Sequence, residues 1–220
     1  WIIDTKATYI MGVPIHAMDL LAQQRDAGIA RLGSVQTFYM AGSPIPSTVA
    51  AAFVDQGIKP QNVYGMTENS SHQYTHPDDD MDTIINTCGR GGPAYKIRIF
   101  DMENADVEVP PGTVGQIGGK GACLTLGYFA NQEATQGSFN RGGWFLSGDL
   151  GFIDAKDNLV VEGRLKDLII RGGYNIYPSH IEALTMRHAE VEKAAAFPIA
   201  DERLGEKVCL AVKGDVASHA

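Results

Sequence analysis

The hydrophobic positions in the first 65 residues predict alternating strands and helices. Apolar and β-branched runs predict three strands, at residues 8–11, 35–40 and 62–64. Between the first two strands, a helix is predicted over residues 15–27, with Pro14 near its start and Gly28 as its stop. Its apolar positions fall at helical spacing: Ile15, Met18, Leu21 and Ala22. A second helix is predicted between the last two strands, capped by Ser47 and ended by Gly57.

Strands and helices in this order form parallel sheets with right-handed crossovers. Ligands bind such sheets beyond the carboxyl ends of the strands. Two loops are therefore expected to open on the same edge, at residues 41–44 (Ala-Gly-Ser-Pro) and 65–69 (Gly-Met-Thr-Glu-Asn). The topology alone predicts a binding site there.

From about residue 88 the pattern changes to short alternating stretches separated by glycine and proline, which predicts a compact antiparallel sheet or barrel. The expected strands are 96–100, 114–117 and 123–128, followed by a hairpin of 150–153 and 159–162. Beyond the hairpin, strands are predicted at 168–170, 190–197 and 207–212. Pro178 is expected to open a helix with Ile181 and Leu184 on its inner face.

The predicted fold class is therefore α/β, in three successive parts. Residues 1–87 form a parallel β-α-β portion and residues 88–165 an antiparallel β portion, together making one larger domain of residues 1–165. Residues 166–220 form a small α+β domain. The boundary is expected at the polar segment 164–167, which separates two sheet systems.

Composition and charge exclude several classes of function. The net charge is −8, from 18 basic and 26 acidic residues without a basic run, which argues against a nucleic-acid partner. No apolar run approaches the ~18 residues of a membrane span, and no signal pattern opens the chain. A cytoplasmic protein is expected. The three cysteines are far apart and lack a C-x-x-C pair; Cys88, Cys123 and Cys209 are expected to be buried small hydrophobes.

Two histidines at a spacing of four residues suggest a possible metal site. His72 and His76 lie four apart, before three aspartates. No helix is expected through this segment, so a solvated acidic loop is favoured over a metal site.

Three segments carry candidate chemistry, each with a simpler alternative. Residues 64–68 offer an aromatic face for a base, a hydroxyl for a phosphate and a carboxylate for Mg²⁺, or else form a capped turn. Asp149, between glycines, can accept two hydrogen bonds from a ribose, or else form an Asx turn. Residues 163–173 place three cations and two glycines around a strand, either to meet phosphates or as a solvated edge.

Read together, these segments resemble three signature motifs of adenylate-forming enzymes: the acyl-CoA synthetases, luciferases and adenylation domains. Residues 41–44 resemble that family's adenine-side loop, and residues 188–205 resemble the segment after its hinge helix. The resemblance covers nearly the whole chain, with matching order and spacing. It implies a truncated adenylate-forming enzyme fold.

The resemblance also implies roles for individual residues. Nucleotide binding would fall to Ala41, Gly42, Ser43, Tyr64, Gly65, Thr67, Asp149 and Arg164. Thr67 and Glu68 would be catalytic, with Thr67 on a phosphate and Glu68 holding Mg²⁺. The remaining roles would be the acyl pocket for Asn69 and Ser70, the hinge for Lys166, and the CoA tunnel for Gly172 and Gly173.

The implied reaction has two steps. A carboxylate attacks the α-phosphate of ATP to give acyl-AMP and pyrophosphate, and a thiol then displaces AMP. The leading interpretation is a carboxylate–CoA ligase for small alicyclic, aromatic or medium-chain acids, such as cyclohexanecarboxylate. The resemblance to the family also implies a homodimer, which no residue pattern in this chain indicates by itself. Two alternatives stay open: an adenylation domain that loads a carrier protein, and a non-catalytic adenylate-binding module.

Two family motifs are not found in this chain. The phosphate loop with its lysine would lie upstream of Tyr64, and the catalytic lysine motif would lie beyond Ala220. The chain is therefore expected to be a fragment that does not adenylate acids efficiently alone.

Overall fold

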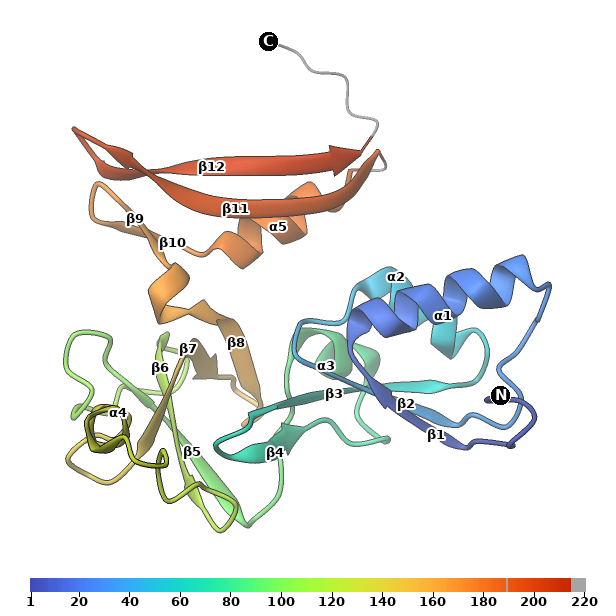
Figure 1. Ribbon diagram of the computed structural model, residues 1–220, viewed down its shortest axis with the longest axis horizontal. Helices are drawn as coiled ribbons and strands as arrows, with labels where there is room; N and C mark the ends of the chain where they lie inside the picture. The colour runs from blue at the N-terminus through green and yellow to red at the C-terminus, as the bar shows by residue number, and fades with distance from the viewer. Residues whose placement is uncertain (189, 215–220) are drawn as a thin grey trace.

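The computed structural model describes residues 1–188 and 190–214. Three four-stranded sheets follow one another along the chain (Figure 1). The first carries the N-terminal helices, the second lies beside it, and the third is reached through a short linker above the second. The predicted α/β class, with a parallel portion followed by antiparallel sheets, is confirmed.

The first sheet has the order β1-β2-β3-β4. Strands β1 (Tyr9–Gly12), β2 (Thr37–Ala41) and β3 (Lys59–Met66) are parallel, as predicted, and β4 (Ser70–Tyr74) returns antiparallel to β3. Helices α1 (Pro14–Asp26) and α2 (Ser47–Val54) are the two predicted crossovers. Strand β4 and helix α3 (Met81–Asn86) were not predicted.

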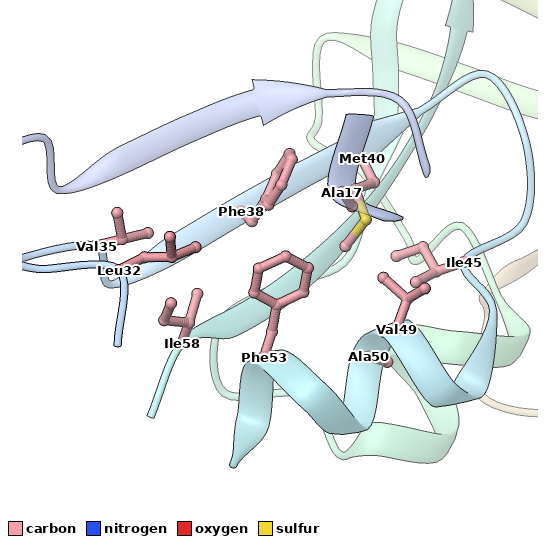
Figure 2. Close-up of a cluster of buried hydrophobic side chains, with 10 residues drawn as sticks. All are labelled: Ala17, Leu32, Val35, Phe38, Met40, Ile45, Val49, Ala50, Phe53 and Ile58. Carbon is pink, nitrogen blue, oxygen red and sulfur yellow. The ribbon is translucent and has the colours of Figure 1, made fainter. Parts of the chain in front are cut away.

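The core of this portion lies between the sheet and its helices. Figure 2 shows Phe53 of α2 facing Phe38 of β2, and the two rings meet edge to face with centroids 5.2 Å apart. Aliphatic side chains from the helices, strands and loops surround this pair. Burying such apolar area is the main stabilising contribution to a sheet covered by helices.

The predicted inner face of α1 is partly wrong. Ile15 and Met18 are exposed, whereas Ala17 and Gln24 are buried. Gln24 exchanges two hydrogen bonds with Gln56, at 2.9 and 3.0 Å. A polar residue satisfied in this way can face the core, so a pattern that counts only apolar residues places the face incorrectly.

The second sheet is wholly antiparallel, in the order β5-β6-β7-β8. Its strands are β5 (Tyr95–Phe100), β6 (Gly115–Gly121), β7 (Phe145–Ile153) and β8 (Leu159–Arg164), with helix α4 (Gln132–Gly137) between β6 and β7. The strand predicted at 123–128 is wrong, because that segment is irregular. The Asx-turn alternative for Asp149 is also wrong, since this residue lies within β7.

Two further expectations are corrected. His72 lies in β4 and is 4% exposed, so it is no part of a solvated loop, whereas His76 is exposed. Among the cysteines, Cys88 is buried as expected, Cys209 is half-buried, and Cys123 is exposed. The cause for Cys123 is local: it follows β6 in the irregular segment rather than in a paired strand.

The third sheet has the order β10-β9-β12-β11. A single 3₁₀ turn, η1 (Leu165–Asp167), leads from β8 into β9 (Ile169–Arg171), β10 (Tyr174–Ile176), α5 (Pro178–Thr185), β11 (Val191–Asp201) and β12 (Gly205–Gly214). Ile181 of α5 is half-buried, but Leu184 is 66% exposed, against the prediction. Positions 215–220 of the predicted small domain lie outside the described residues.

Helix α5 contacts β8 across this linker. Ser179 donates a hydrogen bond to the carbonyl oxygen of Glu162, and the His180 ring is hydrogen-bonded to the Glu162 carboxylate. In the described part of the chain, no helix is long and apolar enough to cross a membrane.

Candidate functional site

A cavity of about 240 Å³ opens where the first two sheets meet. Its walls come from the loop after β2, the end of β3, the end of α3, and strands β7 and β8. Of the residues singled out from the sequence, those lining it are Gly42, Ser43, Tyr64, Gly65, Asp149 and Arg164. The cavity therefore lies at the predicted edge of the parallel sheet.

Asp149 is the polar centre of this cavity. Its Oδ2 accepts a 2.8 Å hydrogen bond from the Tyr64 hydroxyl, and its Oδ1 lies 3.3 Å from Nε of Arg164. The β7–β8 register places Asp149 directly opposite Arg164. The backbone N–H of Asp149 donates to Oγ of Ser147 at 3.1 Å, and that hydroxyl donates to the Ile117 carbonyl at 3.0 Å. Strand pairing and side chains together fix the carboxylate.

Burial and charge act in opposite directions on Asp149. Burial raises the pKa of the Asp149 carboxyl above its ordinary value, while the Tyr64 hydrogen bond and the Arg164 charge lower it. Burial, reinforced by the Asp149 charge, raises the pKa of Tyr64. The Tyr64 hydroxyl therefore remains a protonated donor at neutral pH, facing an acceptor that Arg164 helps to keep ionised.

The Tyr64 ring contacts His72, which in turn stacks on Tyr95. Its centroid lies 5.4 Å from that of His72 in an edge-to-face arrangement, and His72 stacks on Tyr95 at 4.1 Å. Burial lowers the pKa of His72 to about 4, so the imidazole is neutral. Neither ring nitrogen of His72 has a hydrogen-bond partner among the residues that the structure describes.

The turn from β3 to β4 needs a glycine at position 65. A Cβ atom there would lie 1.8 Å from the carbonyl oxygen of Ser70. Asn69 closes the turn, because its Oδ1 accepts from the Met66 N–H at 3.0 Å and its own N–H donates to the Met66 carbonyl at 3.2 Å. The Asn69 side chain is therefore buried within the turn, and Thr67 and Ser70 are exposed on it.

A second hollow, of about 580 Å³, adjoins the first through Met66 and Arg164, which line both. Glu68 and Lys166 face it together with Ser147, Gly148 and Leu165. The sequence-derived candidates thus divide between the two hollows and the turn. Ala41 lies at the end of β2, beside Gly42. Gly172 and Gly173 lie apart, in the β9–β10 turn with φ of 58° and 85°.

Sequence reasoning missed part of the cavity wall. Asn62 lines it, with Nδ2 donating to the Thr87 carbonyl at 2.8 Å, and the end of α3 contributes residues up to Cys88. Burial raises the pKa of the Cys88 thiol to about 12. Asn62 could have been found, because it is two residues before Tyr64 on the same strand face. No local pattern marks the α3 residues.

Glu68 is the candidate metal ligand. Within residues 1–188 and 190–214, no three His, Cys, Asp or Glu side chains gather in a metal-binding group. Mg²⁺ is commonly held by one or two carboxylates together with substrate phosphates and water. A single carboxylate facing a hollow fits that mode of binding, in which the nucleotide supplies the other oxygens.

Comparison with known proteins identifies the family. The family model described as AMP-binding enzyme matches residues 1–129, so this chain belongs to that family. Over 204 residues the chain is 33% identical to the medium-chain fatty-acid–CoA ligase of Escherichia coli K12, covering 93% of this chain and 36% of that protein. It is 38% identical to the 2-succinylbenzoate–CoA ligase of Bacillus mycoides, covering 91% of this chain and 42% of that protein.

Solved structures agree with this assignment. ATP-bound MatB from Rhodopseudomonas palustris matches with a TM-score of 0.87 and 30% identity, over 97% of this chain and 42% of that chain. The o-succinylbenzoate CoA synthetase of Bacillus subtilis, in complex with the acyl-adenylate intermediate OSB-AMP, matches with a TM-score of 0.83 and 28% identity, over 96% and 43%. The chain thus spans well under half the length of these relatives.

Proposed function

We propose that this chain serves an ATP-dependent carboxylate–CoA ligase, which forms an acyl-adenylate and then an acyl-CoA thioester. The observation that carries the proposal is the Tyr64–Asp149–Arg164 arrangement at a cavity on the carboxyl edge of a parallel sheet. The curated relatives cited above are CoA ligases, which favours CoA over a carrier-protein thiol as the acceptor.

In this proposal the cavity holds the adenosine part of ATP. The Tyr64 ring stacks on adenine, and the backbone at Ala41, Gly42 and Ser43 borders the base from the β2 side. Asp149 accepts hydrogen bonds from the ribose hydroxyls, assisted by Arg164. A carboxylate has about four acceptor positions, so the contacts with Tyr64 and Arg164 leave room for two hydroxyl donors.

The second hollow takes the phosphates. Thr67 donates to a phosphate oxygen, and Glu68 holds Mg²⁺, which neutralises charge on the phosphates when it is bound. The Lys166 ammonium faces the same hollow and adds a positive charge at the linker. Ser70 and the backbone of Asn69, at the turn beside Glu68, border the acyl group, and Gly65 lines the cavity beside the nucleotide.

We also propose a division into a larger domain of residues 1–165 and a smaller one from 166 onward. Lys166 in η1 is the hinge residue. Rotation there would bring Gly172 and Gly173 toward the site as the wall of a CoA tunnel. Such a rotation would exclude water in each half-reaction and let one pocket serve both.

The acid is proposed to be small or medium in size. The relatives named above are ligases of medium-chain fatty acids and of 2-succinylbenzoate, which supports the medium-chain and aromatic acids among those expected from the sequence.

The test is ATP–pyrophosphate exchange by the full-length protein carrying this chain, with a panel of alicyclic, aromatic and medium-chain acids. We expect exchange with one group of acids, and AMP release once CoA is added. Exchange without CoA-dependent AMP release would favour a carrier-protein acceptor. AMP binding without exchange for any acid would favour a non-catalytic nucleotide-binding module.

A further inference from the structure

The loop that follows β6 is tied to the turn carrying Glu68. The backbone N–H of Thr125 donates a 2.7 Å hydrogen bond to the Glu68 carbonyl. The Cys123 thiol donates to the Asn69 carbonyl at 2.9 Å. The Tyr128 hydroxyl donates to Oε1 of Glu68 at 3.0 Å, across a sequence separation of 60 residues. The loop therefore holds both the backbone and the side chain of Glu68.

The Tyr128 side chain contributes little to any core. It is 39% exposed, and its neighbours Leu126 and Phe129 are fully exposed. Its position is nevertheless fixed: the Tyr128 N–H donates to Oγ1 of Thr135 in α4 at 2.9 Å. A tyrosine anchored by its backbone on an exposed loop, with its hydroxyl on a carboxylate, is suited to orienting that carboxylate.

The chemistry of the donor matters as much as its position. Glu68 forms no ion pair with any described residue, so Tyr128 orients the carboxylate through a neutral hydroxyl. A lysine or arginine at this place would neutralise the negative charge that attracts a divalent cation. One hydroxyl donor occupies one of about four acceptor positions of a carboxylate, which leaves Oε2 and one side of Oε1 available.

We infer that Tyr128 is a positioning residue for the divalent cation, which it serves by fixing the Glu68 carboxylate without neutralising it. This inference rests on the proposed function only in taking Glu68 as the Mg²⁺ ligand. A ligating carboxylate held in advance by a hydrogen bond loses less conformational freedom on binding, and loss of such an outer partner weakens metal binding.

The test uses Tyr128→Phe in the full-length protein carrying this chain. Binding of a non-hydrolysable ATP analogue is measured by calorimetry over a range of Mg²⁺ concentrations, and AMP binding is measured without Mg²⁺. We expect the Mg²⁺ concentration for half-maximal enhancement of analogue binding to rise about tenfold. This is the change expected for the loss of one of the weaker hydrogen bonds to a charged group. AMP affinity should stay within about twofold, because the Tyr64–Asp149 contacts are unchanged.

Two comparisons make the result specific. Tyr9→Phe removes the hydroxyl of an exposed tyrosine on β1, outside both hollows, and should leave both affinities unchanged. In a Glu68→Gln background, Tyr128→Phe should add no further change, because residues that act through one another are not additive. The inference is overturned if Tyr128→Phe leaves the Mg²⁺ requirement unchanged, if it changes it equally in both backgrounds, or if AMP affinity falls by the same factor.

These binding measurements need no acid substrate. If pyrophosphate exchange failed with every acid, the ligase proposal would fail while the Tyr128 comparison could still be read. If exchange succeeded and the Mg²⁺ requirement of Tyr128→Phe matched wild type, only the inference about Tyr128 would fail.

Discussion

The hydroxyl of Tyr64, near the end of β3, donates a 2.8 Å hydrogen bond to Oδ2 of Asp149 in β7, 85 residues later in the chain. This contact joins the first sheet to the second, and both residues line the cavity. Because the two side chains are hydrogen-bonded to each other, a substitution of either one removes a partner of the other.

Asp149→Ala should weaken nucleotide binding. The substitution removes the acceptor proposed for two ribose hydroxyls, and hydrogen bonds to charged groups contribute about 1.5–3 kcal/mol each. Two such bonds amount to at least about 3 kcal/mol, so we expect AMP affinity, measured by calorimetry, to fall at least about a hundredfold. Asp4→Ala, at an exposed aspartate near the N-terminus, is the control and should bind AMP as wild type does. An unchanged affinity in Asp149→Ala would show that the ribose contact is misassigned.

His72→Phe should flatten the dependence of stability on pH. Folding lowers the pKa of His72 from its ordinary 6.5 to about 4. Between these two values the unfolded chain binds a proton that the folded protein does not, so the free energy of unfolding falls as the pH drops through this window. At pH 5 the loss amounts to about 2 kcal/mol relative to pH 7.

Urea unfolding at pH 7 and pH 5 measures this effect. His72→Phe keeps an aromatic ring between Tyr64 and Tyr95 and should lose about 2 kcal/mol less than wild type over this interval. The same substitution at the exposed His76 should retain the wild-type difference. An identical difference in wild type and His72→Phe would mean that His72 is not the group responsible.

Gly65→Ala should destabilise the β3–β4 turn and impair the site. The added methyl would meet the Ser70 carbonyl oxygen at 1.8 Å, a contact that only movement of the backbone can relieve. Such overpacking costs about 1–3 kcal/mol or more. Thermal unfolding with and without AMP measures both effects. Gly137→Ala, in α4 with open space around its Cβ position, is the matched control and should be neutral or slightly stabilising.

The outline of the first sheet could be predicted because alternation of strand and helix is a local pattern. Strand β4 could not, since Ser70–Tyr74 is a polar sequence of low strand propensity. Its pairing with β3 and the burial of His72 and Gln73 override that local preference. Conversely, residues 123–128 alternate like a strand, yet the Thr125 N–H pairs with Glu68 instead of a neighbouring strand.

In the site, too, contacts between distant segments could not be predicted from local sequence patterns. The motif around Tyr64 and the glycines flanking Asp149 suggested nucleotide chemistry, but no local signal indicates that their side chains meet. The resemblance to adenylate-forming enzymes placed both in one site. The contact between Tyr128 and Glu68 joins the loop after β6 to the β3–β4 turn, and neither periodicity nor spacing along the chain predicts such a contact.

Glu162→Ala should loosen the small C-terminal part from the second sheet. It removes the carboxylate that pairs with His180, leaving the Ser179 hydrogen bond to the backbone of residue 162. A hydrogen bond contributes about 1 kcal/mol net, so its loss should raise the population of other orientations about fivefold. Distances between spin labels on β6 and β12 would report the distribution.

The control for this change is Glu192→Ala, which removes the partner of Lys213 within the β11–β12 hairpin and leaves α5 and β8 untouched. Its distance distribution should match wild type. If Glu162→Ala also matches wild type, the contact with α5 does not determine the orientation of the small part.

The shortness of η1 has a mechanical consequence. This single turn of three residues leads into a sheet whose longest strand, β11, has 11 residues and so extends about 36 Å at ~3.3 Å per residue. A pivot at η1 would displace each point of this sheet in proportion to its distance from the turn, although only a few backbone dihedrals change. If the hinge lies at η1 as proposed, the far end of the β11–β12 hairpin would move much further than the three residues of the turn itself.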